Sequence, residues 1–235
     1  MILNSHSLGV GMYSRAEVAR LLKMTPSRVS RWVRGYSYWL RCEPEERHRK
    51  QPPVVTTRLR ELEGVFVLSF LDLMELRVIR ALVDEVGLSL QQIRAAAKMA
   101  MELFHTRHPF ATHRVFYDTH RLFAPLSKDA VIELTSRNQQ LISVHAFEPY
   151  LKEVDFDTSS GLANRWWPLG KDVPIVLDPH VAFGAPVLAG TATRTDVVAT
   201  LAQYVPHEEA ARAYAIELGG VRAAVEFENE LRAAA

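Results

Sequence analysis

Residues 13–35 constrain the fold more than any other part of the sequence, because they predict two short helices joined by a tight turn. Ser14-Arg15-Ala16-Glu17 has the form of a capping box, in which the serine accepts an orphan backbone N–H and Glu17 reaches back. Thr25-Pro26 opens a second helix, with threonine as N-cap and proline at the first helical position. With Lys23 and Met24 in the turn, the pattern indicates a helix-turn-helix.

The second helix exposes short hydroxyls and arginines, because Val29, Trp32 and Val33 supply its apolar face. Hydroxyls and guanidinium groups are the side chains that contact DNA phosphates and base edges. We therefore expect this helix to lie in the major groove, with nearby basic residues on the phosphates. The residues predicted to contact DNA are Ser14, Arg15, Lys23, Thr25, Ser27, Arg28, Ser30, Arg31, Arg34, Arg49 and Lys50.

The charge is divided unevenly along the chain. Residues 1–60, the basic head, contain 12 Lys and Arg against four Asp and Glu, a net charge of +8. Residues 61–235, the acidic body, contain 16 against 23, a net charge of −7. A basic head on an acidic body is typical of a nucleic-acid-binding domain joined to a second module, the alternative being a solvated charged surface.

The segment after the second helix predicts a wing. Residues 36–40 favour a strand, residues 43–53 form a charged tip, and residues 54–57 favour a returning strand. Arg49 and Lys50 in this tip are expected to lie along a phosphate backbone. A flexible charged loop is the alternative interpretation.

Two amphipathic helices come next, over residues 68–86 and from the capping box at 89–92 to about residue 104. Residues 105–157 predict a small α+β region, with strands at 115–117, 122–123, 131–134 and 141–144 and a helix at 147–154. Residues 158–161 are typical of a linker. We expect the buried stripe of the second amphipathic helix to comprise Ile93, Ala96, Ala97, Met101 and Phe104.

Three short helices are predicted near the C-terminus, over 195–204, from 206 to a break at Gly219-Gly220, and over 221–231, as a homeodomain-like bundle. The fold class is therefore mostly α with small β elements (α+β). The predicted domains are 1–105, a winged helix-turn-helix with its following helices, then 106–157, and then 158–235, a helical bundle for dimerisation or partner binding.

Neither an enzyme nor a metal site is indicated by the sequence. Cys42 is the single cysteine, and His105, His108, His113 and His120 match no zinc motif. No nucleophile elbow, zinc-protease motif or P-loop occurs, so we expect no catalytic residues and no cofactor. No run approaches the roughly 20 apolar residues of a membrane helix. We expect a soluble, cytoplasmic protein.

The residues in 13–32 resemble the N-terminal helix-turn-helix of MerR-type regulators, and 68–76 with 88–94 resemble the helices after the wing in such proteins. The stretch 179–191 is similar to a bacterial domain of unknown function whose signature is a Gly-x-Pro-[Val/Ile]-x-x-Gly-Thr loop. Ala185 and Ala192 stand where that domain often has basic residues. Together the two modules resemble VapB-type antitoxins, which pair with PIN-domain ribonuclease toxins.

This resemblance implies a homodimer that represses its own operon and neutralises a cognate VapC-type ribonuclease by direct binding. Arg222, Glu226 and Arg232 are the candidate residues for toxin binding. A second hypothesis is a MerR-like regulator that senses a small molecule in the central region, near Phe116, Tyr117 and Phe123. A third is an interaction scaffold whose head docks onto an acidic protein.

Overall fold

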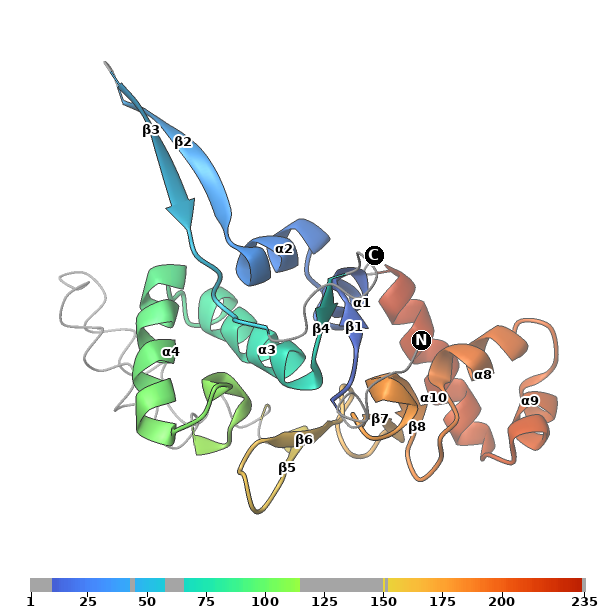
Figure 1. The fold of residues 1–235 in the computed structure, drawn as a ribbon. Coiled ribbons are helices and arrows are strands. Elements are labelled where there is room, and N and C mark those ends of the chain that lie inside the picture. Colours follow the sequence, from blue (N-terminus) through green and yellow to red (C-terminus); the bar gives the residue numbers. More distant parts are fainter. Residues whose placement is uncertain (1–9, 43–44, 58–65, 115–149, 151, 234–235) are drawn as a thin grey trace, which may run out of the picture.

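The computed structural model describes residues 10–42, 45–57, 66–114, 150 and 152–233 (Figure 1). Helices dominate this part of the chain, and small antiparallel sheets connect them. The mostly helical class with small β elements and an N-terminal helix-turn-helix is therefore confirmed. No helix within these residues is both long enough and apolar enough to cross a membrane.

The helix-turn-helix consists of β1 (Tyr13–Ser14), α1 (Arg15–Leu21) and α2 (Pro26–Arg34). The capping box of α1 is complete, since Ser14 N–H donates to Glu17 at 2.7 Å and Glu17 N–H donates to Ser14 Oγ at 3.2 Å. Thr25 caps α2 through Arg28 N–H, and Lys23 makes the turn with a φ of 50°. Local capping signals thus predicted both helix starts correctly.

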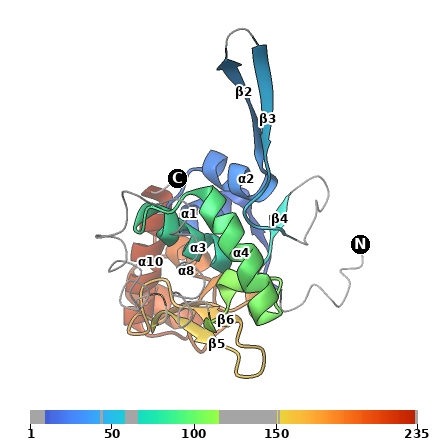
Figure 2. The ribbon, with the colours of Figure 1, turned by 90° about the vertical axis from the view of Figure 1, so that its left-hand side faces the viewer.

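A long hairpin projects from the end of α2 (Figure 2). Its strands are β2 (Tyr36–Cys42) and β3 (Glu45–Gln51), with Tyr36 opposite Gln51. The predicted returning strand at 54–57 is wrong, because β3 falls in the predicted charged tip. Charged residues can form a strand in solvent, whereas the apolar pair Val54 and Val55 is buried, and both their N–H groups donate to Trp32 O.

After the hairpin come β4 (Val67–Leu68), which pairs with β1, and the helices α3 (Phe70–Asp84) and α4 (Leu90–Phe104). Both helices begin with complete capping boxes, as predicted for α4. The predicted stripe of α4 is partly wrong, because Met101 is 43% exposed and Ala100 is buried in its place. The buried residues Ile93, Ala96, Ala100 and Phe104 follow one another in steps of three, four and four residues, which keeps them on one face of the helix. Ala100 therefore takes the buried position that was predicted for Met101.

A four-stranded antiparallel sheet carries the chain from this helical part to the bundle. Its order is β5 (Val154–Phe156), β6 (Ala163–Trp166), β7 (Ile175–Leu177) and β8 (Pro186–Leu188). The predicted helix at 147–154 ends too late, since Val154 starts β5.

The linker predicted at 158–161 is also wrong, because these residues form the turn between β5 and β6. Asp157 Oδ1 organises this turn by accepting hydrogen bonds from the backbone and hydroxyl groups of Ser159 and Ser160. The predicted boundary between 157 and 158 therefore falls inside a hairpin. The four strands predicted between 115 and 144 lie outside the described residues.

The C-terminal part folds into α8 (Thr195–Leu201), α9 (His207–Tyr214) and α10 (Leu218–Ala233), which pack on one another. The helix break predicted at Gly219-Gly220 is wrong, because both glycines lie in the first turn of α10. Gly220 is buried there, and a methyl group in its place would lie 3.5 Å from Leu188 Cδ2. This is an ordinary van der Waals distance, so α10 packs against β8 at this position.

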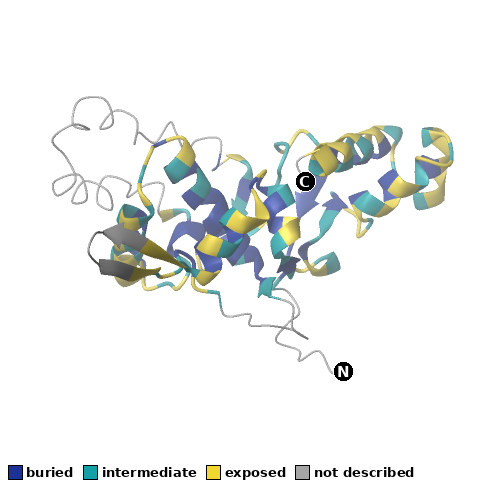
Figure 3. Ribbon diagram, turned by 90° about the horizontal axis from the view of Figure 1, so that it is seen from above, coloured by how far each residue is buried: buried dark blue, intermediate teal, exposed yellow. Residues whose placement is uncertain are grey.

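The buried residues run through the centre of the molecule (Figure 3). One core joins the helix-turn-helix, α3 and α4 to the sheet residues Val154, Trp166 and Leu177. A second core lies under the bundle, and Leu21 of α1 packs against both. The head and the body are thus one packed unit in the part of the chain that the structure describes.

Tyr13 makes the most specific contact between head and body. Its hydroxyl donates to Gly184 O at 2.7 Å, and the neighbouring Met12 N–H donates to Phe183 O at 2.9 Å. Gly184 closes the short helical turn η3 (Ala182–Gly184), and its φ of 85° is one that glycine adopts most easily. Burial raises the pKa of Tyr13, so the side chain remains a neutral hydrogen-bond donor.

We predict that Gly184→Ala destabilises the protein by about 2–4 kcal/mol, through backbone strain and overpacking. A methyl group at this position would lie 2.3 Å from Tyr13 Oη. Gly190→Ala is the matched control, because Gly190, in the turn after β8, has a φ of 76° but nothing within 4 Å of the added methyl. Urea unfolding of both variants checks this, and equal losses would contradict a special role for the Tyr13 contact.

Candidate nucleic-acid interface

Helix α2 presents a polar stripe to solvent. Ser27, Arg31 and Arg34 are exposed and are spaced four and three residues apart, so they lie on one face. On the opposite face Trp32 is only 3% exposed, and the valines of the helix are buried with it. The buried face holds α2 in the domain, and the polar face presents guanidinium and hydroxyl groups on the side from which DNA can approach.

The hairpin continues this surface. The guanidinium carbon of Arg31 lies 5.6 Å from the ring centre of Tyr36, the first residue of β2, and so joins the helix to the hairpin. On β3, Arg49 and Lys50 are exposed opposite Tyr38 and Ser37. The exposed residues of α2 and β3, here called the basic face, are Ser27, Arg31, Arg34, Arg49 and Lys50, with the adjacent Arg49 and Lys50 on opposite faces of the hairpin.

Two exposed aromatic residues also lie on the hairpin and were not predicted as site residues. Trp39 is 63% exposed, and its ring centre lies 4.9 Å from that of His48 on the paired strand. Tyr38, beside it, is 37% exposed. The sequence indicated only that both residues belong to a strand. Because they are exposed on a projecting hairpin, their rings add apolar contact area beside the basic face.

Arg28 is paired with an acidic residue of the same domain, although its side chain is 28% exposed. Its two terminal nitrogens lie 3.0 and 2.5 Å from the carboxylate oxygens of Asp84 in α3, a bidentate pair. The guanidinium also lies over the ring of Trp32, 4.5 Å from its centre. No sequence signal indicates this pairing, because Asp84 is 56 residues away.

Other residues predicted to contact DNA also have structural partners. Arg15 donates to Ser30 Oγ at 2.8 Å, and Lys23 pairs at 3.1 Å with Glu230 near the end of α10. Ser14 and Thr25 use their hydroxyls as helix caps. The Arg34 guanidinium carbon lies 4.7 Å from the ring centre of Phe66, although the residue remains exposed.

The residues predicted to bind a protein partner lie on α10. Arg222, Glu226 and Arg232 are not among the buried residues of this helix, and the first two are four residues apart on one face of it. These three residues belong to the acidic body, whereas the basic face belongs to the head.

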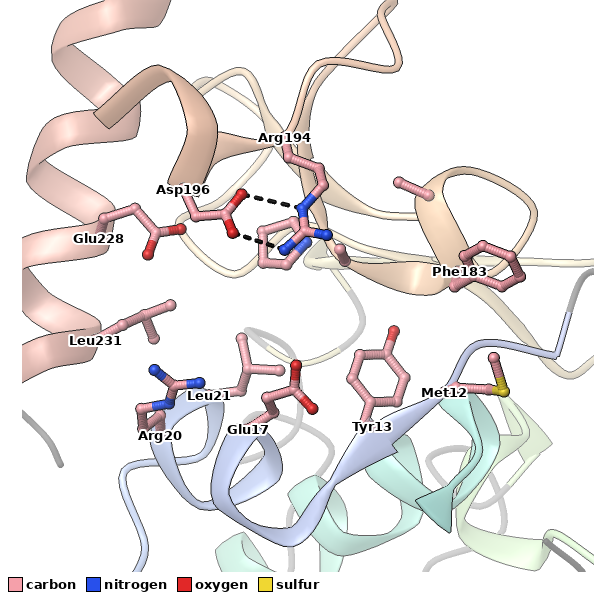
Figure 4. Close-up of a pocket in the computed structure, with 13 residues that line it drawn as sticks. Met12, Tyr13, Glu17, Arg20, Leu21, Phe183, Arg194, Asp196, Glu228 and Leu231 are labelled. Atoms are coloured by element: carbon pink, nitrogen blue, oxygen red, sulfur yellow. Dashed lines mark hydrogen bonds and ion pairs between the residues drawn. The ribbon is translucent and has the colours of Figure 1, made fainter. Parts of the chain in front are cut away.

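A cavity of about 260 Å³ separates α1 from the bundle (Figure 4). Its walls are charged, and several of these charges are already paired, as in the bidentate contact of Arg194 with Asp196. Glu228 accepts a 2.5 Å hydrogen bond from Thr195 Oγ1. The lining residues labelled in Figure 4 are Met12, Tyr13, Glu17, Arg20, Leu21, Phe183, Arg194, Asp196, Glu228 and Leu231.

The pocket that we predicted near Phe116, Tyr117 and Phe123 lies outside the described residues. Of the four histidines considered in the sequence, His120 also lies outside them. His105 ends α4 in a left-handed conformation, and the His113 ring packs on the edge of Phe156. His108 lies beside two buried carboxylates of α3.

Comparison with known proteins identifies the N-terminal part. Residues 11–97 match the family model described as "Putative DNA-binding HTH domain". The crystal structure of Rv2018 from Mycobacterium tuberculosis is similar over 93% of this chain and 98% of its own, with a TM-score of 0.68 and 20% identity. No curated protein matches. The chain therefore carries a DNA-binding helix-turn-helix domain, and it shares the fold of the solved protein.

We predict that Asp84→Ala raises affinity for duplex DNA about two- to fivefold, because it removes an anion beside α2 and releases the Arg28 side chain. Stability should fall by no more than about 1 kcal/mol, since both side chains are partly exposed to solvent. Fluorescence anisotropy at fixed salt measures the affinity. Glu102→Ala, an equal charge change at an exposed position of α4, is the control. The same gain in both variants would contradict this role for Asp84.

Proposed function

We propose that this protein is an antitoxin whose head represses its own operon and whose body neutralises a PIN-domain ribonuclease toxin. The observation that carries the proposal is the basic face of the head, which is presented by a helix-turn-helix packed onto an acidic body. The match of residues 11–97 to a DNA-binding domain supports the first activity. The similarity of residues 13–34 and 179–197 to VapB-type antitoxins supports the second.

The head would bind its operator as half of a dimer. Two copies would place their α2 helices in successive major grooves, roughly 34 Å apart. Arg31 and Arg34 would face the groove from α2, while Arg49 and Lys50 on the projecting hairpin would lie along the flanking phosphates. Serine hydroxyls and backbone N–H groups near the start of α2 would add phosphate contacts that fix its orientation.

We predict that Arg31→Ala and Arg34→Ala each weaken binding to the upstream DNA by about 1–3 kcal/mol if they contact bases. With about three to four phosphates neutralised per head, affinity should fall with salt at a log–log slope of about −0.9 per contact. Gel shifts at several salt concentrations measure both effects.

Arg212→Ala, at an exposed position of α9 in the C-terminal bundle, serves as the control for this experiment. The proposal for the head would be overturned by binding that ignores salt and survives the double variant Arg31→Ala/Arg34→Ala.

The toxin would bind the outer surface of α10. PIN-type ribonucleases are metal-dependent, and an arginine inserted among the metal-binding carboxylates would compete with the metal for them. Arg222 and Arg232 can supply such a group, and Glu226 can pair with a basic residue at the edge of the toxin site. The acidic body, with a net charge of −7 over residues 61–235, would add long-range attraction to a basic partner.

We predict that co-expression with the product of the neighbouring reading frame gives a stable complex and restores growth that the neighbour alone arrests. Substitution of Arg222, Glu226 or Arg232 by alanine should weaken the complex by about 2 kcal/mol or more for at least one of them, as for a central interface residue. Glu208→Ala, at an exposed position of α9, is the control. No complex and no rescue of growth would count against the toxin-binding activity.

The second candidate is a regulator that responds to a small molecule, without a toxin. The cavity of about 260 Å³ between α1 and the bundle favours it, because a ligand there would contact the helix-turn-helix and the body at once. A ligand-dependent melting shift in the isolated protein, together with altered DNA affinity, would distinguish this function. Failure to bind any duplex at low salt would instead favour a scaffold that docks onto an acidic protein.

A further inference from the structure

Asp72 has a carboxylate oxygen whose role the helix cap does not explain. The residue is fully buried at the start of α3. Its Oδ2 accepts hydrogen bonds from Ser69 N–H at 2.8 Å and Thr57 Oγ1 at 2.7 Å. Its Oδ1 has no hydrogen-bond partner among the described residues. A buried anionic oxygen without a donor is costly, so something of positive charge is expected beside it.

Two further metal-binding side chains meet this oxygen. Glu75, only 3% exposed and on the same face of α3, places Oε2 3.2 Å from His108 Nδ1. The same His108 Nδ1 lies 3.9 Å from Asp72 Oδ1. One oxygen from each carboxylate and a ring nitrogen of the histidine all lie within 4.8 Å of one another. The cluster therefore joins α3 to the segment that precedes η2 (Pro109–Ala111).

The cluster places two carboxyl groups beside one imidazole. Among the ion pairs of the described residues, Asp72 and Glu75 meet only His108. The nearby Arg77 is turned to Glu153 and to the rings of Tyr150 and Trp166. Two ionised carboxylates beside a neutral imidazole would carry a net charge of −2, which one divalent cation would neutralise.

The spacing also fits a metal ion. Ligands bound at about 2.0–2.1 Å to a tetrahedral zinc ion lie about 3.4 Å from one another. The two separations from His108 Nδ1, 3.2 and 3.9 Å, bracket that value, and the third, between an oxygen of each carboxylate, is at most 4.8 Å. The His108 side chain is 17% exposed, so this edge of the cluster is open to solvent for the metal and for a water ligand.

We propose that Asp72, Glu75 and His108 bind one divalent transition-metal ion, with Zn²⁺ the best match to one imidazole and two carboxylates. The ion would hold α3 to two other parts of the chain. Glu75 Oε1 accepts from Phe110 N–H of η2 at 3.3 Å, and Asp72 accepts from Thr57, which comes after the hairpin. Metal binding would thus stabilise the base of the DNA-binding hairpin, an effect beyond the proposed antitoxin function.

The test uses full-length protein without a histidine tag, stripped of metal by a chelator. Calorimetric titration with Zn²⁺ should show one equivalent bound, and the melting temperature should rise with Zn²⁺ concentration, because a ligand of the folded state stabilises it. Ca²⁺, which needs six to eight oxygen ligands, should bind far more weakly. Absence of stoichiometric Zn²⁺ binding in the wild-type chain would overturn the proposal.

Asp72→Asn is the most informative variant. Its amide oxygen can still accept from Ser69 and Thr57, so the fold should persist, while the loss of a charged ligand should weaken Zn²⁺ binding. The loss should exceed the roughly 10–100-fold that results from removal of an outer partner of a metal ligand. His108→Ala should do the same.

His105→Asn is the matched control, because it removes an exposed imidazole three residues away, where a φ of 51° suits asparagine. Zn²⁺ affinity should be unchanged in this variant. Circular dichroism checks the folding of each variant, and Glu75→Gln replaces Asp72→Asn if the latter unfolds. Equal Zn²⁺ binding by the wild type and the ligand variants would show that the cluster is a hydrogen-bonded core and not a metal site.

Discussion

The contact of Tyr13 with Gly184 fixes how the DNA-binding helices sit on the rest of the molecule. Tyr13 pairs with β4 through its backbone, fills the core with its ring, and donates its hydroxyl to the loop before β8. It lies two residues before α1, so little freedom remains between this anchor and the helix-turn-helix. The loop before β8 therefore acts as a structural support for the head.

Signals confined to one turn of the chain predicted structure well. Ser14, Thr25 and Ser89 cap the helices as expected, because a cap depends on neighbours three residues away. The end of the hairpin and the start of the last helix were predicted wrongly, because both depend on packing against residues that are distant in the sequence. Val54, three residues after β3, is held by a backbone hydrogen bond to Trp32, and Gly220 is buried in the first turn of α10, a helix that packs on α8 and α9.

In the candidate DNA interface, too, local patterns were predictable from the sequence and contacts between distant residues were not. The exposed arginine stripe of α2 results from its apolar spacing, so Arg31 and Arg34 were recognisable in the sequence. Their neighbour Arg28 was not distinguishable from them, since its partner Asp84 comes from another helix. The cluster of His108 with Asp72 and Glu75 was equally hidden, because it depends on how the chain returns to α3 after α4.

The ion pair of Lys23 with Glu230 makes the distribution of positive charge on the head uneven. Glu230 comes near the C-terminal end of α10, where the helix dipole is also negative, and it neutralises the basic residue in the turn between α1 and α2. On the other side of α2, the hairpin carries the exposed charges of Arg49 and Lys50. In the proposed complex, the exposed cations of the hairpin would attract the duplex more strongly than the turn whose lysine is paired with Glu230.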